Sequence, residues 1–134
     1  MPASRIVDVD CTVIGTARTP FGSTDEAPRQ GAEGDTEGVI ELDPAYAAGL
    51  DGFDPSADVL VVWYADRADR DVLRLDRNPD RGVFTSRSPA RPTPVCLTRC
   101  SVVAVEPERL RVRGVDMVDG TPVLDLKPPL DPTG

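Results

Sequence analysis

Short apolar runs alternate with polar residues along most of this chain, and glycine, proline and acidic residues separate them. A period of two is typical of β-strands that bury one face. We predict strands at residues 6–14, 38–42, 58–64, 82–85, 96–106, 110–115 and 123–127. Because residues 59–63 are all apolar, we expect the third of these strands to be covered on both faces.

Turn-forming residues predict the connections between the strands. Residues 15–37 are rich in Gly, Thr, Asp and Glu, which is typical of a loop, and Asp43-Pro44 predicts a turn with one helical turn through Leu50. Asp119-Gly120 lies between two apolar runs, as in many β-hairpins. About seven short strands predict an all-β chain folded as one domain, 1–134, a small antiparallel barrel or sandwich with long loops.

The composition excludes several classes of site. The chain has no histidine, which rules out a Ser-His-Asp triad and most zinc sites, and three cysteines do not suggest a disulfide framework. Cys96 and Cys100 are better explained as small buried residues on one face of a strand. No apolar run is long enough to span a membrane and the first residues do not resemble a signal peptide, so we expect a cytoplasmic protein without metal or membrane partner.

Charge is segregated along the chain, whose net charge is −8. Residues 1–66 hold 13 acids and 3 bases, a net of −10, whereas residues 67–99 hold 8 arginines and 4 aspartates, a net of +4. An acidic protein repels nucleic acid on average, but a local basic strip can bind phosphate. The same strip also fits a solvated loop whose arginines pair with its own aspartates, Asp69, Asp71, Asp76 and Asp80.

The choice of charged residues is unusual. Of the 15 bases 14 are Arg, and 17 of the 23 acids are Asp. Many short, strongly hydrated acids with almost no lysine predict a salt-loving host, although a GC-rich genome also favours Arg over Lys. A KCl series separates the two explanations, because folding that is unchanged without salt would contradict the first.

Four loop segments carry more chemical groups than a turn requires, and each also has a purely structural explanation. The first three are an Ala-Pro-Arg-Gln sequence at 27–30, the strand end at 64–67 and a proline-stiffened stretch at 87–94. The fourth is residues 116–122 around Asp119-Gly120. Rigid loops at strand ends hold ligand groups at low entropic cost. The structural explanations are solvated loops for the first two, a proline-rich rim or docking motif for the third and a hairpin for the fourth.

Taken in order along the chain, these segments resemble the TsaA-like β-barrel family, which includes tRNA methyltransferases of the TrmO type. The resemblance is carried by Gly-Val-Phe-Thr-Ser-Arg-Ser-Pro at 82–89, by Arg91-Pro92 and by Val-Asp-x-x-Asp-Gly-Thr-Pro-Val-Leu-Asp-Leu-Lys-Pro at 115–128. Further matches are Pro-Arg-Gln at 28–30 and Gly-Val-Ile-Glu-Leu at 38–42. They keep the family's order over almost the whole chain, which makes them more specific than any one tripeptide.

The resemblance implies a β-barrel that works as a homodimer, with S-adenosyl-L-methionine bound near the subunit interface. It also implies methyl transfer to N6 of threonylcarbamoyladenosine in the anticodon loop of a tRNA. By the same resemblance, Arg91 and Thr93 would contact the substrate. The cofactor contacts that it implies are Pro28, Arg29, Gln30, Asp66, Arg67, Arg87, Leu97, Met117, Val118, Asp119, Gly120 and Thr121.

No histidine is present to take the proton that N6 must lose, so Asp66 or a water is the candidate base. Positioning of N6 against the methyl carbon would then supply most of the catalysis. Two other functions fit the same residues. One is a methyltransferase of this fold that acts on a small metabolite, and the other is a non-catalytic module that binds S-adenosyl-L-methionine.

Overall fold

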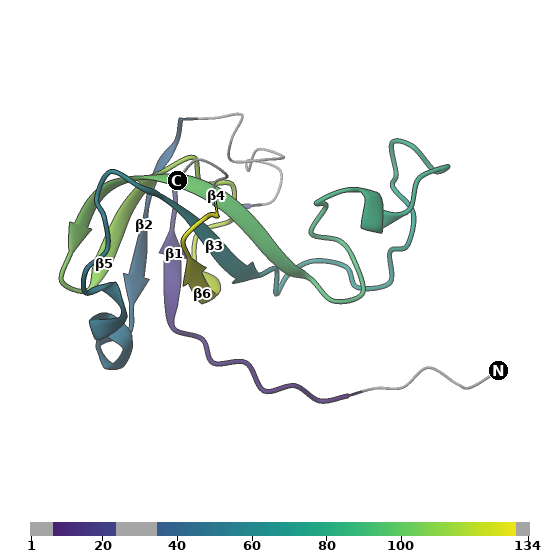
Figure 1. Cartoon of the computed structure of the whole chain (residues 1–134). Coiled ribbons are helices and arrows are strands. Elements are labelled where there is room, and N and C mark those ends of the chain that lie inside the picture. The colour runs from purple at the N-terminus through teal and green to yellow at the C-terminus, as the bar shows by residue number, and fades with distance from the viewer. Residues whose placement is uncertain (1–6, 24–34, 131–134) are drawn as a thin grey trace.

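The computed structural model describes residues 7–23 and 35–130 and shows six strands closed into a barrel (Figure 1). The strands are β1 (Gly15–Arg18), β2 (Glu37–Leu42), β3 (Asp58–Tyr64), β4 (Val95–Glu106), β5 (Arg109–Arg113) and β6 (Thr121–Lys127). Their order around the barrel is β1-β2-β5-β4-β3-β6, and each neighbouring pair is antiparallel. The predicted all-β antiparallel barrel is confirmed, with six strands in place of about seven.

Alternating residues of the strands fill the barrel interior. On β3, Val59 and Val61 have no exposed surface and Trp63 is buried beside them. Leu60 and Val62 point to the other face and are half-buried, so the expectation that both faces of this strand are covered is only partly right. The strand is a wall of the barrel, with its inward face buried and its outward face half-buried.

The pairing of β1 with β2 depends on a glycine. A Cβ atom at Gly15 would lie 2.2 Å from the main-chain oxygen of Glu41, so a larger residue cannot occupy this position without moving the strands apart. Gly15 pairs with Leu42 on β2 and with Val123 on β6. It is the first residue of β1, the strand whose pairing with both β2 and β6 closes the barrel. The sequence analysis placed this region in a loop, which was wrong for residues 15–18.

Two predicted strands are absent. Residues 7–13 are extended and pair with none of the described strands, and Val7, Val9 and Val13 are 59%, 73% and 50% exposed. Pairing begins only at Ile14, whose N–H donates to the Val123 carbonyl of β6 at 2.9 Å. An alternating sequence cannot form a strand without a neighbouring edge, and a closed barrel offers none. Residues 82–85 were also wrong as a strand, because η3 (Val83–Thr85) is a single 3-10 turn in which Val83 is the buried residue.

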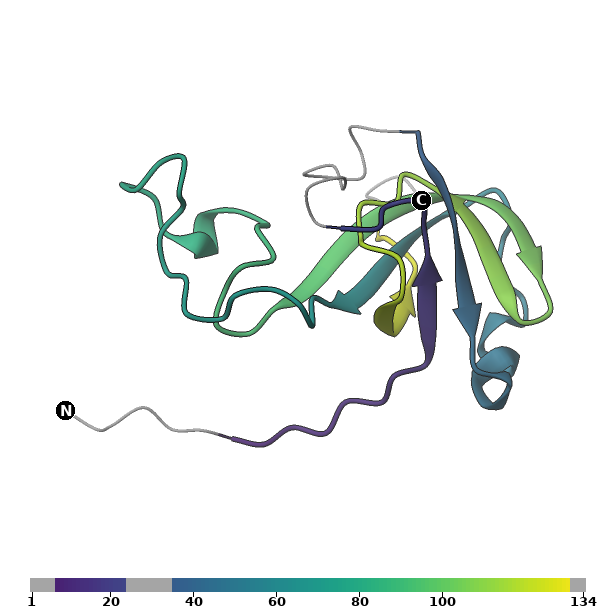
Figure 2. The same ribbon diagram turned by 180° about the vertical axis from the view of Figure 1, so that it is seen from behind.

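The predicted helical turn after Asp43 is confirmed as η2 (Pro44–Leu50), where Oδ1 of Asp43 accepts the N–H of Ala45 at 2.9 Å. Between β3 and β4 the chain leaves the barrel as an excursion loop, residues 65–94. Figures 1 and 2 show this loop extending away from the barrel on the same side as residues 7–14. In the described part of the chain, no helix is long and apolar enough to cross a membrane.

Candidate functional site

The connection from β5 to β6, residues 114–120, is hydrogen-bonded to the end of β1. The Thr19 N–H donates to Oδ1 of Asp119 at 3.0 Å, and the Thr19 hydroxyl donates to the main-chain oxygen of Met117 at 2.8 Å. The Asp119 N–H in turn donates to the Phe21 carbonyl at 2.8 Å. Because β5 and β6 are not neighbours in the barrel, Asp119-Gly120 is a turn in a cross-connection, and its interpretation as a hairpin was wrong.

Burial divides the five predicted contact residues of this turn into two groups. The side chains of Met117, Val118 and Thr121 are buried, and the Thr121 hydroxyl donates to the Val118 carbonyl at 2.6 Å. Asp119 and Gly120 are half-buried. The turn therefore offers a ligand mainly the Asp119 carboxylate and its own main chain.

The end of β3 lies beside this turn. Gly120 has a φ of +85°, a conformation that favours glycine, and a Cβ built on it would lie 3.9 Å from the Nη2 atom of Arg67. The Ala65 N–H donates to the Pro94 carbonyl at 2.9 Å, which joins the two ends of the excursion loop. Two of the four segments singled out in the sequence, 64–67 and 116–122, thus meet at one end of the barrel.

A buried polar chain that the sequence analysis missed runs behind the turn. The indole N–H of Trp63 donates to the Thr98 hydroxyl at 2.9 Å, and this hydroxyl donates to Oδ1 of Asp116 at 2.5 Å. The chain ties β3 and β4 to the 114–120 connection and orients the Asp116 carboxylate. A threonine among the inward residues of β4 was the one available signal, because it places a hydroxyl where an apolar side chain is expected.

Cys96 lies on the same inner face of β4, and the pKa of its thiol depends on burial and on nearby charged side chains. Burial raises the pKa of its thiol to about 11, while the Arg91 guanidinium lowers this pKa and the Asp116 carboxylate raises it. Burial also raises the pKa of Cys100, to about 12. Both cysteines are buried and free, as the sequence predicted.

The arginines of the excursion loop hold the loop together. Arg70 donates to the Pro92 carbonyl at 3.0 Å, and Arg81 donates to the Thr85 carbonyl at 2.8 Å. Nη2 of Arg91 donates to the carbonyls of Val83 and Ser86, so this residue closes the η3 turn. These groups bind main-chain oxygens, which neither interpretation of the basic strip anticipated.

The remaining predicted site residues are spread over several surfaces. Arg87 and Thr93 are exposed on the excursion loop, and Leu97 is 38% exposed on the outer face of β4 opposite Val62. Asp66 is exposed, and within residues 7–23 and 35–130 its carboxylate accepts no hydrogen bond. Pro28, Arg29 and Gln30 lie outside the described residues.

Among the residues that the structure describes, no three Cys, Asp or Glu side chains come together as ligands for a metal ion. The chemical groups gathered at the barrel end are instead carboxylates and a guanidinium. Asp119 contributes one carboxylate, Asp116 contributes a second, and Arg67 supplies the positive charge. Such a set suits a ligand that carries both signs of charge.

Comparison with known proteins decides the family. A family model described as the tRNA-methyltransferase O N-terminal domain matches residues 16–132. The chain belongs to this family. The predicted resemblance is therefore confirmed.

Relatives and solved structures agree with this assignment. A probable S-adenosyl-L-methionine-binding protein of Halobacterium salinarum is 52% identical over 122 residues, which cover 90% of this chain and 98% of the relative. A tRNA (adenine(37)-N6)-methyltransferase of Mus musculus is 53% identical over 47 residues, 35% of this chain and 11% of the relative. The crystal structure of TrmO from Pseudomonas aeruginosa superposes with a TM-score of 0.78 at 28% identity, over 94% of this chain. This chain spans 56% of that TrmO chain.

Proposed function

We propose that this chain binds S-adenosyl-L-methionine and methylates N6 of threonylcarbamoyladenosine beside the anticodon of a tRNA. The observation that carries the proposal is the meeting of Arg67 with the Asp119-Gly120 turn, in a chain of the tRNA-methyltransferase O N-terminal domain family. The names of the relatives support it, because they include both S-adenosyl-L-methionine-binding proteins and a tRNA methyltransferase.

The charges at the barrel end fit this cofactor, which supplies a methyl group on a positively charged sulfur. Arg67 would bind the carboxylate of S-adenosyl-L-methionine, while Asp119 would face the positively charged sulfur of the same molecule. One oxygen of Asp119 is already held by the Thr19 N–H, so its carboxylate is oriented without the ligand. A preformed carboxylate needs no reorganisation when a cation arrives.

The chain's contribution to methyl transfer would be mainly positional. N6 of the substrate has to lie in line with the methyl carbon, and it loses one proton as the new bond forms. Asp66 is the carboxylate that we assign to this proton, since it lies next to Arg67 at the exposed end of β3. Arg91 and Thr93, at the base of the excursion loop, would contact the substrate.

We further propose that the active form is a homodimer in which Arg87 completes the cofactor site of the second subunit. The excursion loop, which includes Arg87, extends away from the barrel (Figure 2). Two large apolar side chains of this loop are exposed, Phe84 to 80% and Leu73 to 61%. Exposed large apolar side chains on a projecting loop are typical of an interface.

Co-expression of two variants tests this arrangement. In a mixed dimer of Arg87→Ala and Asp119→Asn, one site would contain both changes and the other neither. Sharing across the interface therefore predicts recovery of about a quarter of wild-type turnover, although each variant alone has little. If Arg87 serves its own subunit, no site in the mixture is intact and no turnover returns.

The function itself is tested by mass spectrometry of tRNA nucleosides from a deletion strain. Loss of the methylated form of threonylcarbamoyladenosine, restored fully by the wild-type chain and only partly by Asp119→Asn, is the expected result. Retention of the methylated nucleoside in the deletion strain would contradict the proposal.

A second function, cofactor binding without catalysis, is favoured by one observation. The candidate base Asp66 is exposed, and no described residue orients its carboxylate. In this alternative the purified chain binds S-adenosyl-L-methionine but releases no S-adenosylhomocysteine with any tRNA. Turnover with the unmethylated tRNA from the deletion strain would eliminate it.

A further inference from the structure

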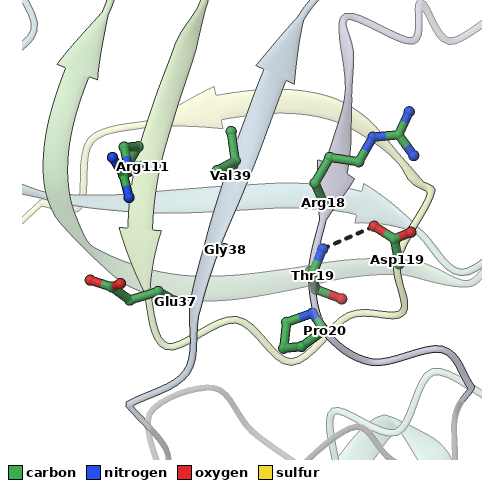
Figure 3. A pocket seen from close by; sticks show the side chains of 8 residues that line it. All are labelled: Arg18, Thr19, Pro20, Glu37, Gly38, Val39, Arg111 and Asp119. Atoms are coloured by element: carbon green, nitrogen blue, oxygen red, sulfur yellow. Dashed lines mark hydrogen bonds between the residues drawn. The ribbon is translucent and has the colours of Figure 1, made fainter.

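The outer face of the barrel carries a row of three residues across β1, β2 and β5. Arg18 pairs with Val39, and Val39 pairs with Arg111, so the two arginines flank one apolar residue. Neighbouring strands are about 4.8 Å apart, which puts the two arginine backbones roughly 10 Å from each other. Figure 3 shows both side chains on the same face on either side of Val39.

This row lines an open pocket of about 300 Å³. Pro20 and Thr19 form one side of the pocket, and the acidic groups of Asp119 and Glu37 lie at its edges. Both acids already have partners. Asp119 accepts the Thr19 N–H at 3.0 Å, and Oε1 of Glu37 lies 3.2 Å from Nη2 of Arg113.

Arg18 and Arg111 differ from each other in their ion pairs with acidic side chains. Nε of Arg18 lies 3.5 Å from Oε2 of Glu41. Both side chains are about half-exposed, so this ion pair contributes little free energy in water. Arg111 is exposed, and in the described part of the chain its guanidinium has no ion pair and no hydrogen bond. Its neighbours on β5, Arg109 and Arg113, are both paired with glutamates. The pocket therefore presents one free guanidinium and one weakly held one.

We propose that this pocket binds a ribose-phosphate unit of RNA outside the methylated nucleotide. Arg111, with Arg18 beside it, would donate to the phosphate oxygens, since a guanidinium matches the geometry of a phosphate. The second carboxylate oxygen of Glu37, at the pocket edge, would accept the ribose 2′-hydroxyl, the group that distinguishes RNA from DNA. This inference rests on the proposed function, because it supplies a path for the tRNA beyond the methylation site.

The position of the pocket supports such a path. Asp119 belongs both to this pocket and to the turn at the candidate cofactor site. A strand of RNA that leaves the methylation site on the β1 side would cross Thr19 and Pro20 and reach Arg111. The net charge of −8 opposes non-specific RNA binding, so a small number of fixed arginines would determine where the backbone lies on this face of the barrel.

Fluorescence anisotropy with a labelled anticodon stem-loop RNA tests the inference over a series of KCl concentrations. For Arg111→Gln we expect roughly 3- to 10-fold weaker binding at low salt, and a slope of log K against log [KCl] that is smaller by about one. Arg109→Gln is the matched control, because Arg109 lies on the same face of β5, outside the pocket, and is paired with Glu106. Thermal melting of both variants checks that each folds like the wild type.

Each outcome has a separate meaning. If Arg111→Gln and Arg109→Gln bind the stem-loop equally, the pocket inference is overturned while the proposed function stands. If the wild-type chain binds S-adenosyl-L-methionine but not the RNA, the proposed function fails and the inference fails with it. A DNA stem-loop of the same sequence tests the 2′-hydroxyl contact. Glu37→Ala removes the accepting carboxylate and should change RNA affinity relative to DNA affinity, and an equal change in both affinities would contradict that part.

Discussion

The barrel and the excursion loop are stabilised by different interactions. In the barrel, residues such as Val61, Leu110 and Val123 lose all exposed surface, and six strands satisfy one another's main-chain groups. In the excursion loop Val83 is the one described residue between 66 and 93 that is buried. That loop is held by arginine side chains bound to its own carbonyls.

This difference matters for function. Hydrogen bonds to the end of β1 attach the 114–120 connection, and with it Asp119, to the barrel, which has a buried core. A loop held by solvent-exposed hydrogen bonds can open locally without unfolding the barrel. We infer that Asp119 is positioned by the first region, whereas Arg67, Arg87 and the contacts with a second subunit depend on the second.

The strongest test of the contrast is a charge in the barrel wall. Val61→Asp places a carboxylate where the native side chain has no exposed surface, and we expect it to cost several kcal/mol and to unfold the protein. Val103→Asp on the outer face of β4, where the native side chain is 41% exposed, is the control. Chemical denaturation monitored by Trp63 fluorescence measures both. Equal losses of stability would show that the two faces are not different.

High pH should also weaken the barrel. The Cys96 and Cys100 thiols have pKa values of about 11 and 12 in the folded state, above their ordinary value near 9. Their contribution to stability is complete below pH 9, and it is lost as the pH rises through these values, because the unfolded chain then releases protons first. The expected slope is about 1.4 kcal/mol per thiol per pH unit above pH 9.

Denaturation curves between pH 8 and 11 measure this slope, and Cys96→Ala/Cys100→Ala should flatten it. A thiol reagent at pH 8 gives a second readout, because Cys11 is exposed on the segment outside the barrel. Fast labelling of Cys96 or Cys100 in the folded protein would contradict their burial.

A milder change addresses the loop. Arg91→Gln removes the guanidinium that binds the carbonyls of Val83 and Ser86, at a local cost of about 1–2 kcal/mol. We expect faster proteolysis within residues 66–93 and a nearly unchanged melting temperature. Arg74→Gln, which loses a single bond to the Pro79 carbonyl, should give a smaller increase in cleavage. A large drop in melting temperature for Arg91→Gln would mean that the loop and the barrel unfold together.

The sequence predicted the strands that have both an alternating pattern and a neighbour to pair with, such as 58–64 and 96–106. It was wrong for residues 7–13, because alternation says nothing about whether a free edge exists. The Asp119-Gly120 signal is local, and no local signal tells a hairpin from a cross-connection. The chain from Trp63 through Thr98 to Asp116 joins residues that are 35 and 18 positions apart, and no spacing rule predicts such a contact.

The most direct test is the affinity for S-adenosyl-L-methionine, measured by isothermal titration calorimetry, of Asp119→Asn against Asp125→Asn. Both aspartates are half-buried and accept a main-chain N–H through Oδ1, a bond that asparagine can keep. With Asp119 at the cofactor, its change should weaken binding about tenfold without lowering the melting temperature, while Asp125→Asn binds like the wild type. Equal affinities for the two variants would contradict a cofactor site at the 117–121 turn.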